Sequence, residues 1–292
     1  MPSLKEVRLR IASVKNTRQI TNAMKLVSAS KFRKAQRSII STRPYAQKLR
    51  ELLGNLAAAS GEMAFPFSES RPDENVLLVG ISSNKGLCGA FNSNVIKAVK
   101  KEAEEQFGKQ LAAGSLKIMG VGRHVSDFFF KKGFPFAGRY DHLVARVSYE
   151  AAAAFADELM ERWKKGEFNH IWLIYNQFKN AATQIITVEP FLPLSGTPEK
   201  KTGKLVEYLY LPNRSEVLED LVIQTLRMQI YKALLDSFAA EQGARMTAMM
   251  KATDNASEML KDLQLQYNKA RQAAITREII EIVSGANALG GK

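Results

Sequence analysis

Cysteine is nearly absent from this chain of 292 residues, which contains only Cys88. An internal disulfide is therefore excluded, and a reducing compartment is the expected setting. Histidine is also scarce, and its three residues have no metal-ligand spacing, so we expect neither a metal nor another cofactor. Acidic residues are spread along helical faces rather than paired for acid–base chemistry. No catalytic constellation is visible, and we expect the chain to make and break no bonds itself.

Long hydrophobic runs are missing too. One of the longest, Ile171–Tyr175, is far shorter than the ~20 residues that span a bilayer. Charged residues at Lys5, Glu6 and Arg8 interrupt any apolar core of a secretory signal. With 46% apolar and 24% charged residues, the chain is expected to fold around hydrophobic cores rather than to be disordered.

The first 50 residues contain almost no negative charge. They hold six lysines and seven arginines against one acid, Glu6, which gives this segment a net charge of +12. The rest of the chain holds 29 basic and 28 acidic residues and is nearly neutral. A basic segment of this kind can meet nucleic acid, anionic lipid or an acidic protein surface.

Residues 2–57 have the pattern of one long helix. Apolar residues recur at steps of three and four, which is typical of a coiled-coil seam. Pro44 removes one helical hydrogen bond, so we expect a kink near Thr42–Arg43 or a short break there. The predicted seam residues are Leu4, Val7, Ile11, Val14, Ile20, Met24, Val27, Ala35, Ile39, Ala46, Leu49, Leu53 and Leu56.

The middle of the chain has a different periodicity. After a linker rich in Pro, Gly and Ser over 60–74, short apolar runs alternate with helical patterns. This alternation predicts an α/β layer domain with a largely parallel sheet. The expected strands are 75–82, 116–121, 171–178 and 183–191, and the expected helices are 92–107, 125–132 and 149–165. A further short strand is predicted at Leu205–Leu211.

A second long helix is predicted from Pro212 to about Asn287. Because each terminal helix has a seam that it cannot bury alone, the two should pair as an antiparallel coiled coil. If Leu56 lies opposite Asn213, the same register places Met24 beside Arg245. The predicted seam of this helix is Met246, Met250, Thr253, Ala256, Leu260, Leu263, Tyr267, Ala270 and Ala274.

This register leaves residues 269–287 as a single overhanging helix of ~28 Å. A lone helix in water would expose its apolar side, so we predict that other subunits enclose this end. The chain then has three parts: an N-terminal coiled-coil helix (1–59), a central α/β domain with linkers (60–211), and a C-terminal coiled-coil helix with the overhanging end (212–292).

Two other functions remain open at this point. Ser82–Ala90 follows the first strand, where α/β proteins bind phosphate, but its glycine spacing matches no phosphate-binding motif, so a tight structural turn is the favoured interpretation. The basic N-terminal helix is compatible with a coiled-coil nucleic-acid binder. However, its basic residues are interleaved with the seam instead of preceding it, as they would in a bZIP protein.

Three stretches resemble the gamma subunit of F-type ATP synthase. They are Ile11-Ala-Ser-Val-Lys-Asn-Thr-Arg-Gln-Ile-Thr-Asn-Ala-Met-Lys-Leu-Val-Ser-Ala-Ser-Lys31, the turn Ser83-Asn-Lys-Gly-Leu-Cys-Gly-Ala-Phe-Asn92, and Arg245-Met-Thr-Ala-Met-Met-Lys-Ala-Thr-Asp-Asn255 with Ile275-Thr-Arg-Glu-Ile-Ile-Glu-Ile-Val-Ser-Gly-Ala286. The resemblance covers both ends and the centre in the right order. It departs at Asn84, where acidic residues often stand.

The resemblance implies a central Rossmann-like domain, a terminal coiled coil and the role of a rotor. The coiled coil would turn inside a ring of alpha and beta subunits, and the globular part would contact the epsilon subunit and the c-subunit ring, with no nucleic acid. It implies a peripheral position on the cytoplasmic face of a bacterial inner membrane. The implied partner contacts are Met24, Lys25, Arg245, Gln272, Ile275, Thr276, Glu278, Ile279, Ile282 and Val283.

Overall fold

A computed structural model describes residues 3–60, 67–69, 71–72, 74–181, 183–194 and 213–290. Two helices dominate it: α1 (Leu4–Ser60) and α7 (Arg214–Gly290). Both begin with a reciprocal cap, because the Ser3 and Asn213 side chains accept from the backbone N–H groups of Glu6 and Glu216. In return, Glu6 accepts from the Ser3 backbone N–H group, and Glu216 accepts from the Asn213 side-chain amide. The predicted strand at Leu205–Leu211 lies outside the described residues.

The chain divides into two compact units. The coil unit contains residues 1–27 and 246–292, and the body unit contains residues 28–245. The three-part division made from the sequence stays a prediction, because both long helices contribute to both units.

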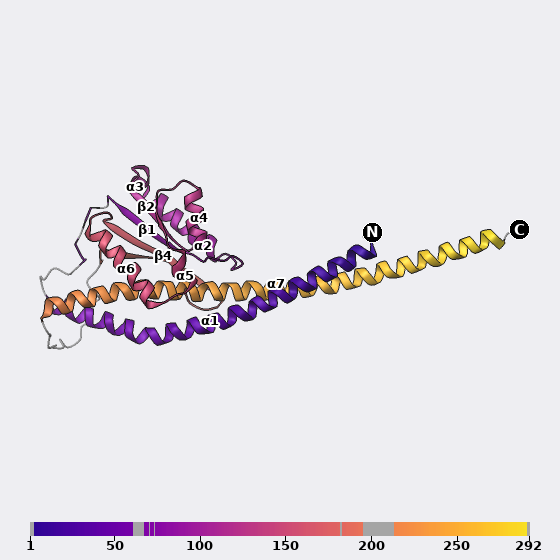
Figure 1. The fold of residues 1–292 in the computed structure, drawn as a ribbon, viewed down its shortest axis with the longest axis horizontal. Coiled ribbons are helices and arrows are strands. Elements are labelled where there is room, and N and C mark those ends of the chain that lie inside the picture. The colour runs from indigo at the N-terminus through magenta and orange to yellow at the C-terminus, as the bar shows by residue number, and fades with distance from the viewer. Residues whose placement is uncertain are drawn as a thin grey trace. The chain divides into compact units, whose positions relative to one another are not determined.

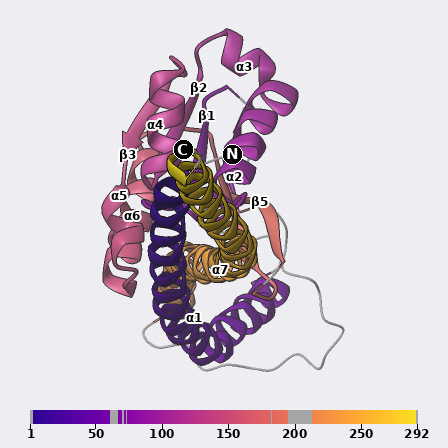
Figure 2. The ribbon, with the colours of Figure 1, turned by 90° about the vertical axis from the view of Figure 1, so that its right-hand side faces the viewer.

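The body unit contains a five-stranded sheet in the order β3-β2-β1-β4-β5, with β3 and β5 at its opposite edges (Figure 2). The strands are β1 (Val76–Ile81), β2 (Leu116–Val121), β3 (Phe136–Arg139), β4 (His170–Phe178) and β5 (Gln184–Leu192). All neighbouring pairs are parallel except the β4–β5 hairpin. The prediction of a mixed α/β fold with a largely parallel sheet and long terminal helices is therefore confirmed.

Helices cover both faces of the sheet, which is why its strands are continuous apolar runs. One face packs on α2 (Phe91–Lys101) and α4 (Arg123–Lys131), and the other packs on α6 (Tyr149–Lys164) and part of α7. Figure 1 shows α2 and α4 on one side of the strands and α6 on the other. Alternate β1 residues enter opposite cores, with Leu77 and Val79 on one face and Val76 and Leu78 on the other.

Several short elements were not predicted. The expected helix 92–107 stops at Lys101 and continues as a π-helical segment, η1 (Glu102–Gln106), followed by α3 (Gly108–Ala112). Strand β3 and helix α5 (Asp141–Ala145) were also missed. β3 has four residues, follows Pro135 and lies half-exposed at the sheet edge, so it lacks the apolar run by which the inner strands were recognised.

Pro44 does not break α1, which is one helix of 57 residues. The sequence predicted either a kink or a short break near this proline, and the prediction of a break was wrong. Pro44 lies on an exposed side of the helix. The carbonyl group that loses its helical partner there can therefore bond to water.

A period of seven residues recurs among the buried residues of α1 and α7. In the coil unit, α1 buries Val7 and Thr21, and α7 buries Met249, Ala256 and Leu263. The body unit continues the two series with Ser28 and Ala35 in α1 and with Met228, Leu235 and Gln242 in α7. Predicting Ile20, Val27 and Met250 as seam residues was wrong, since all three are exposed. The period of seven that begins at Val7 passes through Thr21 and Ser28. Because these two residues are polar, the prediction placed the seam at their apolar neighbours Ile20 and Val27 instead.

The antiparallel register differs between the units. In the body unit, Tyr45 donates to Gln224, as the predicted register requires. In the coil unit, Thr253 donates to Thr21 at 2.8 Å, and Arg8 donates to Tyr267 at 3.0 Å. The predicted register would have placed Thr21 opposite Ala248, more than one helical turn away from Thr253. It was therefore wrong in the coil unit.

Candidate functional site

The turn between β1 and α2 is held by its own side chains. Ser83 donates its backbone N–H to Asn92 Oδ1 at 3.0 Å and its hydroxyl to the Lys85 carbonyl at 2.7 Å. Asn92 also donates to Cys88 Sγ at 3.2 Å. Cys88 is buried, and burial raises the pKa of its thiol, so the cysteine favours the protonated form and packs as a small apolar residue.

The first turn of α4 is occupied by the chain itself. Its backbone N–H groups at Arg123, His124 and Val125 donate to Asn84 Oδ1, the Ser83 carbonyl and Ser82 Oγ. A helix N-terminus binds phosphate through donors of this kind, so these three are not free for a nucleotide. The geometry favours the structural interpretation of the Ser82–Ala90 turn.

The position at which nucleotide-binding sheets hold their ligand is also filled. β1 lies between β2 and β4, where the chain reverses its direction across the sheet. There Asn176 of β4 donates to the Phe91 carbonyl at 3.2 Å. Cys88 and Phe91 pack on Ala240 of α7. The carboxyl edge of the sheet is thus closed by the turn and by α7.

Arg245 of α7 attaches this turn to the long helix. Its Nη2 donates to the Lys85 carbonyl at 2.8 Å and to the Gly86 carbonyl at 3.2 Å, and its Nε donates to Gly86 at 3.2 Å. Its Nη1 lies 2.6 Å from Glu241 Oε1 in a buried ion pair. Burial raises the pKa of Glu241, and the Arg245 charge opposes this effect.

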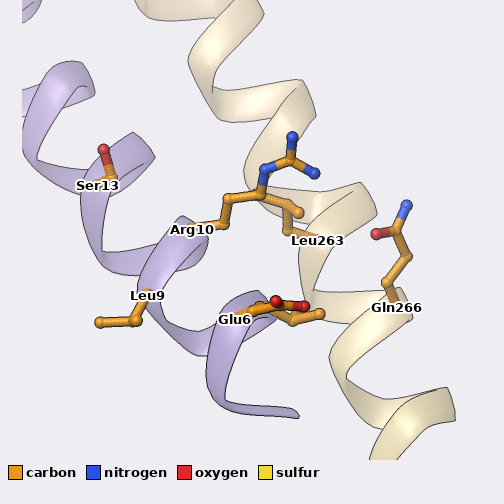
Figure 3. Close-up of a pocket in the computed structure, with 7 residues that line it drawn as sticks. Glu6, Leu9, Arg10, Ser13, Leu263 and Gln266 are labelled. Atoms are coloured by element: carbon orange, nitrogen blue, oxygen red, sulfur yellow. The ribbon is translucent and has the colours of Figure 1, made fainter. Parts of the chain in front are cut away.

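The coil unit contains an open groove of about 540 Å³ between α1 and α7 (Figure 3). Buried Val7 and Leu263 and exposed Leu9 form its apolar part, and the other lining side chains are charged or polar. Because Val7 and Leu263 are buried, Leu9 is the apolar lining side chain that faces solvent, with 63% of its surface exposed. The lining residues are Glu6, Val7, Leu9, Arg10, Ser13, Leu263 and Gln266.

The C-terminal end of α7 is exposed on all sides. Every side chain from Arg271 to Asn287 is exposed, which agrees with the predicted overhang. Five of them are large and apolar, with 49% to 65% of their surface exposed: Ile275, Ile279, Ile280, Ile282 and Val283. Further exposed apolar residues of the coil unit are Leu9, Ile20, Leu26, Val27, Met250, Met259 and Leu265.

The ten predicted partner contacts differ in accessibility. Met24 and Lys25 are half-buried in the coil unit, whereas Gln272, Ile275, Thr276, Glu278, Ile279, Ile282 and Val283 are exposed. Arg245, in the body unit, is the one buried residue of the ten. Its partner Glu241 was missed, although their spacing of four residues on a helix is the signal for such a pair.

The described part of the chain has neither a side-chain cluster suited to a metal ion nor a candidate membrane span. No group of His, Cys, Asp and Glu side chains among those residues is arranged to hold a metal ion. Likewise, none of the helices described has an apolar stretch long enough to cross a bilayer.

Known proteins resemble this chain over its full length. A sequence model described as ATP synthase matches residues 3–289. ATP synthase gamma chains of Flavobacterium johnsoniae and Christiangramia forsetii are each 49% identical over 292 residues and are covered completely, as is this chain. The gamma chain of Geobacter metallireducens is 41% identical over 291 residues, again with complete coverage of both chains.

Solved structures share the fold. A chain from the central stalk and c-ring of the Tetrahymena thermophila mitochondrial ATP synthase is 26% identical, with a TM-score of 0.58 over 80% of this chain and 99% of that one. A chain from the Euglena gracilis mitochondrial ATP synthase is 20% identical, with a TM-score of 0.70 over 99% of this chain and 95% of that one. Because ATP synthase gamma chains match it over their full length at 41% to 49% identity, the chain belongs to the family of ATP synthase gamma chains.

Proposed function

We propose that this chain is the central-stalk rotor of an F-type ATP synthase. It turns inside a ring of alpha and beta subunits and couples proton flow through the membrane to ATP synthesis or hydrolysis. It is a subunit without a catalytic site of its own. Its other partners are the epsilon subunit and the c-subunit ring, and its place is peripheral, on the cytoplasmic face of a bacterial inner membrane.

The exposed apolar end of α7 is the observation that carries this proposal. A single helix with five large apolar side chains in water would be marginal on its own. Such a surface is typical of a segment that other protein chains enclose. A shaft that ends inside a ring requires this arrangement, and a basic coiled coil that binds nucleic acid does not.

The proposed partner contacts are the accessible residues that were predicted from the sequence. Met24 and Lys25 belong to the basic N-terminal segment, which suits an acidic surface on the ring. Gln272 and the six predicted residues from Ile275 to Val283 lie on the overhang and suit a mainly apolar sleeve. Arg245 was predicted as a direct contact, but its buried position favours a role within the chain.

Polar substitution of the overhang is expected to weaken assembly without weakening the fold. Ile279→Gln with Ile282→Gln removes two exposed apolar side chains while keeping good helix formers. We expect unchanged thermal unfolding of the isolated chain and at least about tenfold weaker binding to a purified alpha–beta ring, because each buried isoleucine contributes about 2 kcal/mol. Thermal unfolding followed by circular dichroism measures the first quantity, and binding titration with native mass spectrometry measures the second.

The matched control is Ile279→Leu with Ile282→Leu, which keeps the apolar area and should bind as the unmodified chain does. Equal binding of the glutamine and leucine variants would contradict the enclosed overhang. Recovery of the unmodified chain from its own cells with nucleic acid, and without ring subunits, would contradict the rotor itself and favour the basic coiled-coil alternative.

A further inference from the structure

The guanidinium group of Arg245 is completely engaged inside the body unit. Each of its three nitrogens donates to an acceptor of the same chain, either a turn carbonyl or Glu241. Only 7% of the residue is exposed. A side chain with this arrangement fixes the position of the groups that it binds, among them the carbonyls of Lys85 and Gly86.

The turn that Arg245 holds is conformationally strained. Leu87, next to Gly86, has a φ of 62°, in the left-handed region that side chains other than glycine rarely adopt. Leu87 is 63% exposed, so its own packing does not compensate for this strain. Strained residues persist where the surrounding bonds determine their conformation, and the bonds to Lys85 and Gly86 immediately precede Leu87.

The same turn follows β1 directly, and its other residues are bonded to α5, α4 and α2 beside the sheet. Asn84 donates to the Asp141 carbonyl at 2.8 Å and accepts from the Arg123 backbone, and Ser83 is bonded to Asn92 of α2. Arg245 is bonded from α7 to carbonyls within this network. The turn is therefore a joint between the sheet and the long helix, and Arg245 is its polar attachment on the helix side.

We infer that Arg245 is a positioning residue, which with Glu241 locks the Lys85–Gly89 turn onto α7 so that the sheet and the helix move as one body. This inference rests on the proposed rotor function, because a rotor must transmit torque between its long helices and its globular part. The planar fork of arginine is essential, since it reaches two carbonyls and a carboxylate at once.

Two sets of substitutions separate the effect of the Arg245 charge from the effect of its planar guanidinium group. Arg245→Lys keeps the charge beside Glu241 but cannot bridge both carbonyls. Arg245→Met with Glu241→Gln removes both charges and leaves no unpaired buried ion, so that it folds even if the single variant does not. The control is Arg227→Lys, which alters a similar fork from α7 to Asp157 of α6.

Hydrogen exchange of the full-length chain reports on the joint itself. We expect backbone amides of the Lys85–Phe91 segment to exchange about tenfold faster or more in both Arg245 variants, because charged hydrogen bonds are lost there. In Arg227→Lys the exchange of this segment should not change. Unchanged exchange of the segment in both Arg245 variants would overturn the inference.

Coupling in the assembled complex separates the joint from a direct partner contact. In vesicles containing the reconstituted complex, we expect the Arg245 variants to keep ATP hydrolysis but to pump fewer protons for each ATP hydrolysed. If a variant loses coupling while hydrogen exchange of the Lys85–Phe91 amides stays unchanged, Arg245 acts on a partner subunit. This result would overturn the inference that Arg245 holds the turn. Failure of the unmodified chain to assemble or pump would contradict the rotor function instead.

Discussion

Replacement of Gly122 by alanine is expected to destabilise the body unit by about 3–5 kcal/mol. A Cβ atom at this position would lie 2.2 Å from the Ser82 carbonyl oxygen, which is backbone and cannot rotate away. The φ of Gly122 is 104°, so alanine would also be strained without any clash. Relief of the clash would separate the end of β1 from β2, where Ser82 donates to the Val121 carbonyl at 2.8 Å.

Tryptophan fluorescence during urea unfolding measures this effect, because both tryptophans, Trp163 and Trp172, lie in the body unit. The control is Gly133→Ala. Its φ of 74° is also left-handed, but a Cβ atom there meets nothing within 4 Å. The control should therefore cost only about 1–2 kcal/mol of backbone strain. Equal unfolding midpoints for the two variants would show that the contact with Ser82 carries no energy.

Replacement of Asp236 by asparagine is expected to stabilise the body unit at neutral pH. Asp236 is buried, and desolvation raises its pKa from 3.8 to about 6, although Lys232 and Arg43 favour its charged form. Glu189 adds to the rise. Holding the carboxylate ionised at pH 8 costs up to about 3 kcal/mol relative to the unfolded chain, and asparagine removes this cost.

The sign of the pH dependence follows from the raised pKa. Between about pH 4 and pH 6 the folded chain binds more protons at Asp236 than the unfolded chain does, so the free energy of unfolding falls as the pH rises through this window. Asp236→Asn should remove this part of the slope in urea unfolding measured from pH 4 to pH 8. An unchanged slope would contradict the assignment.

Asp157→Asn is the control of opposite sign. Asp157 accepts two hydrogen bonds from Arg227, at 2.7 and 2.9 Å, in a partly exposed pair. Its loss should destabilise the body unit by about 0.5–1 kcal/mol at neutral pH. Stabilisation by both substitutions would mean that removing negative charge is favourable in general, rather than at the buried position.

The sequence was sufficient for elements whose pattern is long and locally repeated. The two terminal helices repeat their apolar residues over many turns, and β1, β2 and β4 are buried on both faces and read as apolar runs. Strand β3 depends instead on pairing with β2 at the sheet edge, and its half-exposed residues contain no signal of it.

The candidate site divides in the same way. The exposed overhang could be predicted because it follows from the difference in length between two paired helices. The buried position of Arg245 could not be predicted, because two of its three acceptors are carbonyls of a turn about 160 residues away in the chain. Every residue has a backbone carbonyl group, so no pattern of side chains in the sequence marks the carbonyl groups that Arg245 binds.

By itself, the amino-acid sequence determined the class of fold, the pairing of the two terminal helices, the apolar overhang and the resemblance to the gamma-subunit family. These features depend on periodicity, composition and local motifs. The tertiary structure decided which heptad positions are buried, where Thr21 meets Thr253, and how the turn after β1 is closed by α7. Those outcomes depend on contacts between segments far apart in the chain, whose geometry is set only when the sheet and the helices pack together.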